Sequence, residues 1–165
     1  MIAKEKMGKI DSLVLANYIL KHYGPMSHLK LQKLLYYCDA YCLAFFGEEL
    51  ISDKFEAWVH GPVSRKVFNE LKGISILYAD MEYSPIEGID EDKAFNELPS
   101  EWQELLKEVL DDLNTMTGLQ LERKTHGERP WIEARKGYSE ADKCEVEISK
   151  ETTAQFYRLE QQLNA

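Results

Sequence analysis

The sequence predicts a mainly α fold of the α+β class: a compact bundle of about six helices with a small two- or three-stranded sheet. Over most of the chain, apolar residues recur at steps of three and four, the period of amphipathic helices. Alternation with a period of two is confined to residues 55–60 and 144–148. Because 165 residues can bury one core without staples, residues 10–165 are predicted as a single domain after a mobile basic tail, residues 1–9.

Two helices are expected near the start of the chain. The first covers residues 11–23, with Asp11 as its cap, and ends before a Gly-Pro pair. The second covers residues 28–46, with Ser27 as its cap and Gly47 as its end. Its core-facing stripe is expected to consist of Leu31, Leu34, Leu35, Cys38, Cys42 and Phe45.

A different face of the second helix carries Lys30, Lys33 and Tyr37. With two further tyrosines nearby, this helix has more basic and aromatic side chains than packing alone requires. These three residues are therefore predicted to contribute to a partner-binding surface.

A strand joined to a short helix is expected at residues 55–73. The alternation of residues 55–60 predicts a half-buried strand. Gly61 breaks the pattern, and Pro62 is suited to the first position of a helix because its fixed φ fits there. The helix is expected to end at Gly73.

The outer side of this unit is predicted to bind another protein. Trp58 and His60 are expected to point away from the inward-facing residues of the strand. Arg65, Lys66 and Asn69 are expected on the exposed side of the following helix. An aromatic ring beside an arginine is typical of the centre of a protein–protein interface.

The third quarter of the chain begins without a clear period. Residues 76–81 are a candidate strand, and residues 84–93 are expected to be a loop. A long helix is then expected from Ser100, which has Gln103 at capping-box spacing, to Gly118. A further short helical turn is expected at residues 119–125.

The last part of the chain is expected to hold a short helix, a short strand and a final helix. Pro130 marks the start of the short helix and Gly137 its end. Residues 144–148 are the expected strand, and Ser149 the cap of the final helix. The inward-facing residues of that helix are expected to be Phe156, Leu159 and Leu163.

Composition narrows the functional classes. The net charge is −9, and residues 73–112 hold twelve acidic against two basic side chains, so direct nucleic-acid binding is not expected. No apolar run is long enough for a membrane span and no signal peptide is present, which indicates a cytoplasmic protein without membrane contact. Three cysteines without CxxC spacing indicate reduced core residues, and neither a metal nor a cofactor is expected.

Enzymatic alternatives depend on a few side chains. His60 and His126 each precede a glycine, and they could act as base and acid with Asp39 orienting one of them. The alternative is that both imidazoles bond backbone groups and fix turns.

Cys38 and Cys42 have the i,i+4 spacing of two metal ligands, but they lie in an apolar stripe, which favours core packing. Motifs of hydrolases, P-loop proteins and zinc proteases are absent from the sequence.

Three segments together resemble one family. They are KLQKLLYYCDAYCLA (30–44), FEAWVHGPV (55–63) and THGERPWIEAR (125–135), and in this order they resemble the Panacea, or SocA-like, antitoxin domain, with members described as phage-associated proteins of the GepA type. The resemblance covers about residues 10–160. The matching positions are Lys30, Gln32, Lys33, Tyr36, Tyr37, Trp58, His60, Gly61, Pro62, Thr125, His126, Pro130 and Trp131.

The resemblance implies a compact, mainly helical domain with a small sheet and a non-enzymatic role. It implies the neutralising half of a bacterial toxin–antitoxin pair, often carried by a prophage, whose partner is a cognate protein toxin. At least one member delivers its toxin to a cytosolic protease as an adaptor. Within the motifs, Gly61, Pro62, Thr125, His126, Pro130 and Trp131 are expected to be structural.

Three functions are therefore considered. The first is an antitoxin that binds its toxin through the face bearing Trp58, His60 and Arg65. The second is a protease adaptor, or a phage protein that counters a host defence without a dedicated toxin. The third is an enzyme that uses the two histidines.

Overall fold

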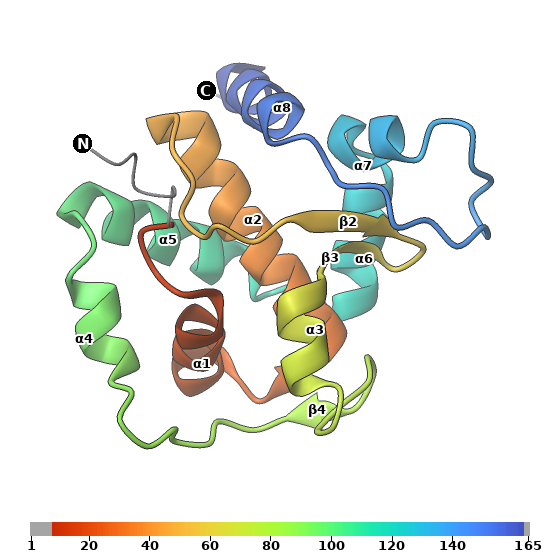
Figure 1. The fold of residues 1–165 in the computed structure, drawn as a ribbon. Helices are drawn as coiled ribbons and strands as arrows, with labels where there is room; N and C mark the ends of the chain where they lie inside the picture. Colours follow the sequence, from red (N-terminus) through yellow and green to blue (C-terminus); the bar gives the residue numbers. More distant parts are fainter. Residues whose placement is uncertain (1–7, 164–165) are drawn as a thin grey trace, which may run out of the picture.

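The computed structural model describes residues 8–163, so the first seven residues of the expected basic tail lie outside the described part. The described residues form eight helices and two antiparallel pairs of short strands (Figure 1). The predicted mainly α fold with small sheets is confirmed. The elements are α1 (Ser12–Tyr23), β1 (Met26–Ser27), α2 (His28–Phe46), β2 (Phe55–Trp58), β3 (Gly61–Ser64), α3 (Arg65–Leu71), β4 (Asp80–Met81), α4 (Glu91–Asn96), α5 (Ser100–Leu113), α6 (Gly118–His126), α7 (Arg129–Ala134) and α8 (Lys150–Leu163).

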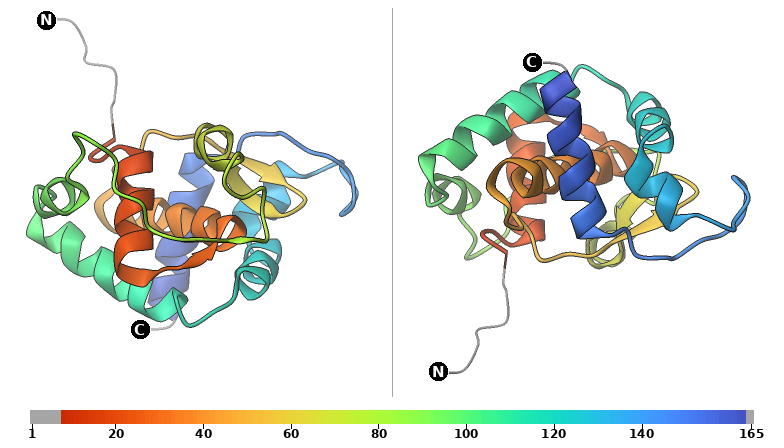
Figure 2. Two further views of the ribbon diagram at one scale, coloured as in Figure 1. Left: turned by 90° about the horizontal axis from the view of Figure 1, so that it is seen from below. Right: turned by 90° about the horizontal axis from the view of Figure 1, so that it is seen from above.

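Helix α2 is the central element of the fold. It packs against α1, α5, α6, α8 and β3, and Figure 2 shows α8 lying across it. All ten residues from 31 to 40 are buried, which marks a helix covered on every side. Its ends match the sequence signals, because the Ser27 hydroxyl accepts a hydrogen bond from the Lys30 amide and Gly47 adopts a φ of 69°.

The predicted elbow at Gly61 and Pro62 is wrong. These residues begin β3, which pairs with β2 in a hairpin that places Pro62 opposite Ala57. Helix α3 starts only at Arg65, because the Ser64 hydroxyl caps it by accepting the amide N–H of Val67 at 3.2 Å. The turn of the hairpin is formed by Val59 and His60, and the Gly-Pro pair begins the returning strand rather than a helix.

The other predicted strands are mostly shorter than expected. Residues 144–148 form a single bridge between Glu147 and Glu56, flanked by hydrogen bonds from Ala57 to Val146 and from Ile148 to Phe55. Within the candidate strand 76–81, only β4 pairs, and its partner is β1. The loop expected at 84–93 is confirmed up to residue 90, but its last three residues belong to α4, which begins at Glu91 with Asp90 as its cap.

The C-terminal helices differ from the predictions in their boundaries. Helix α5 ends at Leu113, before the expected end at Gly118. The short helical turn expected at 119–125 is α6, which Thr117 caps through a capping box with Gln120. In α8, Tyr157 is fully buried, whereas Leu159, predicted to face inwards, is 54% exposed. The side chain of Leu163 lies outside the described residues.

Candidate functional site

Two side chains of α2 form hydrogen bonds with the backbone of the β2–β3 hairpin. The Gln32 amide forms a pair of hydrogen bonds with the backbone of Ser64, accepting from its N–H at 2.9 Å and donating to its carbonyl at 3.2 Å. Lys33 is fully buried, and its Nζ donates to the Pro62 carbonyl at 2.9 Å. Burial lowers the pKa of Lys33 to about 7, although the Glu122 carboxylate partly opposes this shift.

The glycine of the hairpin is required by a close approach. Gly61 has a φ of 93°, and a Cβ added to it would lie 2.6 Å from Cε of Lys33 and 2.7 Å from Oγ1 of Thr125. An L side chain would therefore meet both strain and two buried neighbours. Gly61 and Thr125, expected to be structural, pack against each other, and the Thr125 hydroxyl donates to the Glu122 carbonyl.

The hairpin is also held from α7 and the residue after it. The Trp131 indole N–H donates to the Trp58 carbonyl at 2.8 Å, and Nη1 of buried Arg135 donates to the Ala57 carbonyl at 2.8 Å. Nη2 of Arg135 donates to the carbonyls of Ser139 and Asp142, so one guanidinium ties the loop after α7 to β2. The sequence did not single out Arg135, although its position in the third motif was a signal.

A buried network of tyrosines surrounds the carboxylate of Glu128. The hydroxyls of Tyr37 and Tyr157 both donate to Oε1 of Glu128, and Lys124 donates to its other oxygen at 2.8 Å. Burial raises the pKa of Tyr37 and of Tyr157 above the usual range, so both hydroxyls stay protonated donors. The network joins α2, α6, α7 and α8, and sequence reasoning missed Glu128 because a glutamate beside a helix start usually lies at the surface.

Of the three partner-binding residues predicted on α2, two are buried and one is half-buried. Lys33 and Tyr37 are fully buried, so the exposed basic and aromatic face predicted for this helix is wrong. Lys30 is half-buried and its Nζ donates to the Asn114 carbonyl at 2.8 Å, the carbonyl that follows α5. Lys30 and Lys33 thus donate hydrogen bonds to backbone carbonyls inside the protein. These bonds explain why α2 carries more basic side chains than apolar packing requires.

Trp58 and Arg65 do form one unit at the surface. The Arg65 guanidinium lies 5.3 Å from the Trp58 ring centroid, and the Phe68 ring packs edge-on against that indole with ring centroids 5.0 Å apart. Glu56 accepts from the Trp58 indole at 2.9 Å and from two nitrogens of Arg65. This ion pair lowers the pKa of Glu56 despite partial burial, so the pair is charged at neutral pH.

A hollow of about 350 Å³ lies beside this unit. The loop between α7 and α8, which extends away from the body of the molecule in Figures 1 and 2, forms its far wall. Its lining residues are Trp58, Val59, His60, Arg65, Ala141, Lys143, Cys144 and Glu145. Lys66 and Asn69 lie further along α3 and are exposed, with Lys66 paired to Asp11 at 2.9 Å.

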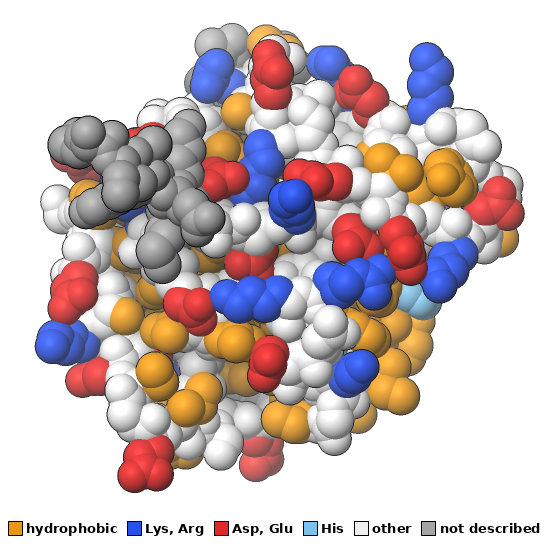
Figure 3. All heavy atoms as spheres, in the orientation of Figure 1, with side chains coloured by type: hydrophobic (Ala, Val, Ile, Leu, Met, Phe, Trp, Pro, Cys, Tyr) orange, Lys and Arg blue, Asp and Glu red, His pale blue; other side chains and the backbone are white. Residues whose placement is uncertain are grey.

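The segment after α3 leaves three large apolar side chains exposed. Ile74 and Ile76 are each 69% exposed and Tyr78 is 63% exposed. The Tyr78 ring meets the His60 ring edge-on at 6.2 Å, which places this segment next to the hairpin turn. Figure 3 shows apolar side chains gathered beside a histidine over the segment between α3 and β4. Residues 74–78 show no clear period in the sequence, so they were missed as a candidate site.

We call this surface the hairpin face. It consists of Trp58, His60, Arg65, Lys66, Asn69, Ile74, Ile76 and Tyr78.

The two histidines considered for catalysis line different hollows. His60 lies in the hollow beside Trp58, with Nδ1 3.5 Å from the Glu122 carboxylate, whereas His126 stacks on Trp131 at 4.1 Å and lines a separate hollow. Asp39, proposed to orient an imidazole, instead accepts from two backbone amides after α2 and from Lys150.

Metal ligation is not supported by the described side chains. Cys38 and Cys42 are both buried in the core, as the apolar stripe predicted. Among the residues that the structure describes, no group of three or more His, Cys, Asp or Glu side chains is placed to hold a metal ion. Within the same residues, no helix combines the length and apolar character that crossing a membrane requires.

Comparison with known proteins gives one family and one curated relative. The family model described as "Antitoxin SocA-like, Panacea domain" matches residues 31–132, which include the buried part of α2, the hairpin and most of α7. The protein named Antitoxin SocA from Caulobacter vibrioides (strain NA1000 / CB15N) is 38% identical over 63 residues, 36% of this chain. The match spans 34% of that relative, about a third of its length. No solved structure matches the chain.

The family match and the interior contacts agree on the same segments. The matched region contains Gln32, Lys33, Gly61 and Trp131, each of which holds the hairpin in place. The chain belongs to the SocA-like antitoxin family with the Panacea domain.

Proposed function

We propose that this chain is the antitoxin of a toxin–antitoxin pair and that it neutralises its toxin by direct binding through the hairpin face. Family membership supports an antitoxin role without bond-breaking chemistry. The observation that carries the proposed surface is the exposure of Ile74, Ile76 and Tyr78 beside the Trp58–Arg65 unit. Soluble domains leave such contiguous apolar groups exposed mainly where another molecule covers them.

The composition of the face fits a protein partner. Aromatic residues and arginine supply most of the energy at the centre of such interfaces, and both are present here beside a hollow able to receive a partner side chain. The Arg65 side chain is 43% exposed although Glu56 already holds it. A guanidinium fixed in advance loses less conformational entropy when a partner covers it.

The test is rescue of growth when the product of the adjacent gene is expressed as the toxin. Arg65→Glu and Ile76→Ser are expected to abolish or strongly reduce rescue, with toxin affinity weakened by about 30-fold or more for a central residue. The matched control for Arg65→Glu is Arg129→Glu on α7, where the arginine side chain is 53% exposed and also forms an ion pair. The matched control for Ile76→Ser is Ile89→Ser, at an isoleucine that is 40% exposed in the loop before α4. Both controls should rescue fully.

Full rescue by folded Arg65→Glu and Ile76→Ser would rule out the hairpin face as the toxin-binding surface. The lifetime of the toxin separates two modes of neutralisation. A toxin that stays abundant but inactive indicates occlusion, whereas a toxin that disappears only when this chain is present indicates delivery to a protease.

A further inference from the structure

We propose that the groove between the end of α2 and helix α5 is a second docking surface, which binds a cationic amphipathic segment of a protein partner. We call it the α2–α5 groove. Its volume is about 540 Å³, and it is lined by Phe45, Phe46, Glu101, Glu104, Leu105, Lys107, Glu108 and Asp111. The proposal does not depend on the hairpin face.

The floor of the groove is apolar and partly uncovered. Phe45 is 50% exposed, although it follows the most deeply buried stretch of α2. Its ring lies 6.5 Å from that of Tyr41, while Phe46 stacks on Trp102 at 4.7 Å. Leu105 is half-buried between them and the acidic rim. A phenylalanine left this exposed beside a groove offers an anchor point for a partner's apolar side chain.

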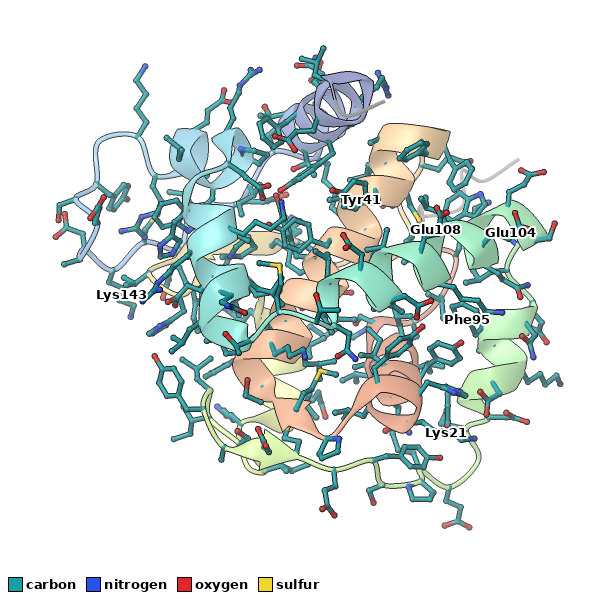
Figure 4. All side chains as sticks on the ribbon, turned by 180° about the vertical axis from the view of Figure 1, so that it is seen from behind. Lys21, Tyr41, Phe95, Glu104, Glu108 and Lys143 are labelled. Atoms are coloured by element: carbon teal, nitrogen blue, oxygen red, sulfur yellow. The ribbon has the colours of Figure 1, made fainter. Side chains whose placement is uncertain are left out.

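The rim is negatively charged and not neutralised from within. Glu101, Glu104 and Glu108 recur along one side of α5, and Figure 4 shows Glu104 and Glu108 towards the end of α2. Among residues 8–160, none of the three has a basic side chain within 4.0 Å, in contrast to Glu56, Asp92 and Glu128. Like charges one turn apart destabilise a helix by a few tenths of a kcal/mol per pair, so this stripe opposes folding.

The basic side chain that lines the groove does not cancel the rim. The ammonium of Lys107 lies 6.0 Å from the ring centroid of Phe95, a residue of α4. Phe95 is placed away from the α2 side of α5 in Figure 4. The groove therefore combines an apolar floor with a negative rim, and the complementary occupant is a helix or extended segment with apolar residues on one side and Lys or Arg beside them.

The groove is separate from the hairpin face. Lys143, which lines the hollow beside Trp58, lies on the opposite side of the molecule from Glu104 and Glu108 in Figure 4. Two proteins could therefore occupy the two surfaces together. An adaptor that brings one protein to another requires two such surfaces, because a single face would make the partners compete.

The test uses the full chain and a defined probe. The probe is a synthetic helix-forming peptide with leucine and lysine at amphipathic spacing, and its counterpart has glutamate in place of every lysine. Binding is measured by fluorescence anisotropy and by amide chemical-shift mapping. The cationic peptide is expected to bind with shifts concentrated at residues 41–46 and 101–111, and more weakly as salt rises, while the anionic peptide does not bind.

Charge-matched variants separate the groove from the overall negative charge. Glu104→Lys with Glu108→Lys is expected to weaken binding by at least about tenfold, whereas Glu82→Lys with Glu87→Lys, which changes net charge equally, should weaken it less than about twofold. Phe45→Ser, at an exposed position, is expected to weaken binding about fivefold or more without loss of folding.

Equal weakening by the two double variants would show general charge attraction only and overturn the proposal. Wild-type affinity in Phe45→Ser would do the same. A dimer in sedimentation that Glu104→Lys with Glu108→Lys dissociates would assign the groove to a second copy. If removal of residues 1–7 changed the amide chemical shifts of the groove residues, the groove would be assigned to the chain's own N-terminus. Either result would contradict the proposed occupant.

Discussion

Replacing Lys33 by methionine should change how the stability of the domain depends on pH. Lys33 is fully buried and burial lowers its pKa to about 7, from the ordinary lysine pKa of 10.5 that applies to the unfolded chain. Between these values the unfolded chain binds the proton and the folded chain does not. Stability should therefore rise with pH across this window and be lost as pH falls from about 10.5 to about 7.

The magnitude follows from the two pKa values. Each pH unit inside the window is worth up to about 1.4 kcal/mol for one proton, and less near the folded pKa, where Lys33 is half protonated. From pH 7 to pH 9 the contribution of Lys33 to the free energy of unfolding should increase by about 2 kcal/mol. Methionine keeps the length of the side chain but cannot titrate, and its loss of the hydrogen bond to the Pro62 carbonyl does not depend on pH.

The assay is urea unfolding of both proteins at pH 7, 8 and 9. The free energy of unfolding of Lys33→Met minus that of the wild type should be about 2 kcal/mol more positive at pH 7 than at pH 9. Lys72→Met, at an exposed lysine, is the control and should run parallel to the wild type. If the stability of Lys33→Met changes with pH in the same way as that of the wild type, Lys33 keeps its proton in the folded state and the reasoning is refuted.

Three further substitutions test the interior contacts of the motifs by thermal or urea unfolding. Gly61→Ala should destabilise the domain by about 2 kcal/mol or more, because its Cβ would meet Lys33 and Thr125 at a φ of 93°; a neutral result would contradict this close approach. Arg135→Lys should cost about 2 kcal/mol, since a single ammonium cannot reach carbonyls on both β2 and the loop after α7, and unchanged stability would show that these bonds are dispensable. Tyr157→Phe should cost about 1–2 kcal/mol by removing one of the two hydroxyls that donate to Oε1 of the buried Glu128 carboxylate, whereas Tyr138→Phe, at an exposed tyrosine, should cost nothing measurable.

The helices that carry most of the core were predictable because their signals are local. The cap at Ser27, the end at Gly47 and the apolar spacing of α2 act within a few residues of one another. The hairpin was not predictable from the same signals. Gly61-Pro62 can begin either a strand or a helix, and the contacts of Ser64 with Gln32, far away in the sequence, favour the strand.

The candidate site was predicted only in part, for a similar reason. The pairing of Trp58 with Arg65 follows from their closeness along the chain, and the structure confirms it. Lys33 and Tyr37 were predicted to be exposed because charged and hydroxyl groups usually are, but buried backbone and a buried carboxylate bind them here. The exposed Ile74 and Tyr78 lack any period that would distinguish them from a loop packed on the core.

The most direct test of the account is hydrogen exchange of this chain alone and in complex with the toxin encoded beside it. The hairpin face is the proposed toxin-binding surface, and the motif residues beneath it support it. Added protection should therefore appear at residues 56–69 and 74–78. Protection that leaves these residues unchanged and appears elsewhere, around His126 and Trp131 for example, would contradict it.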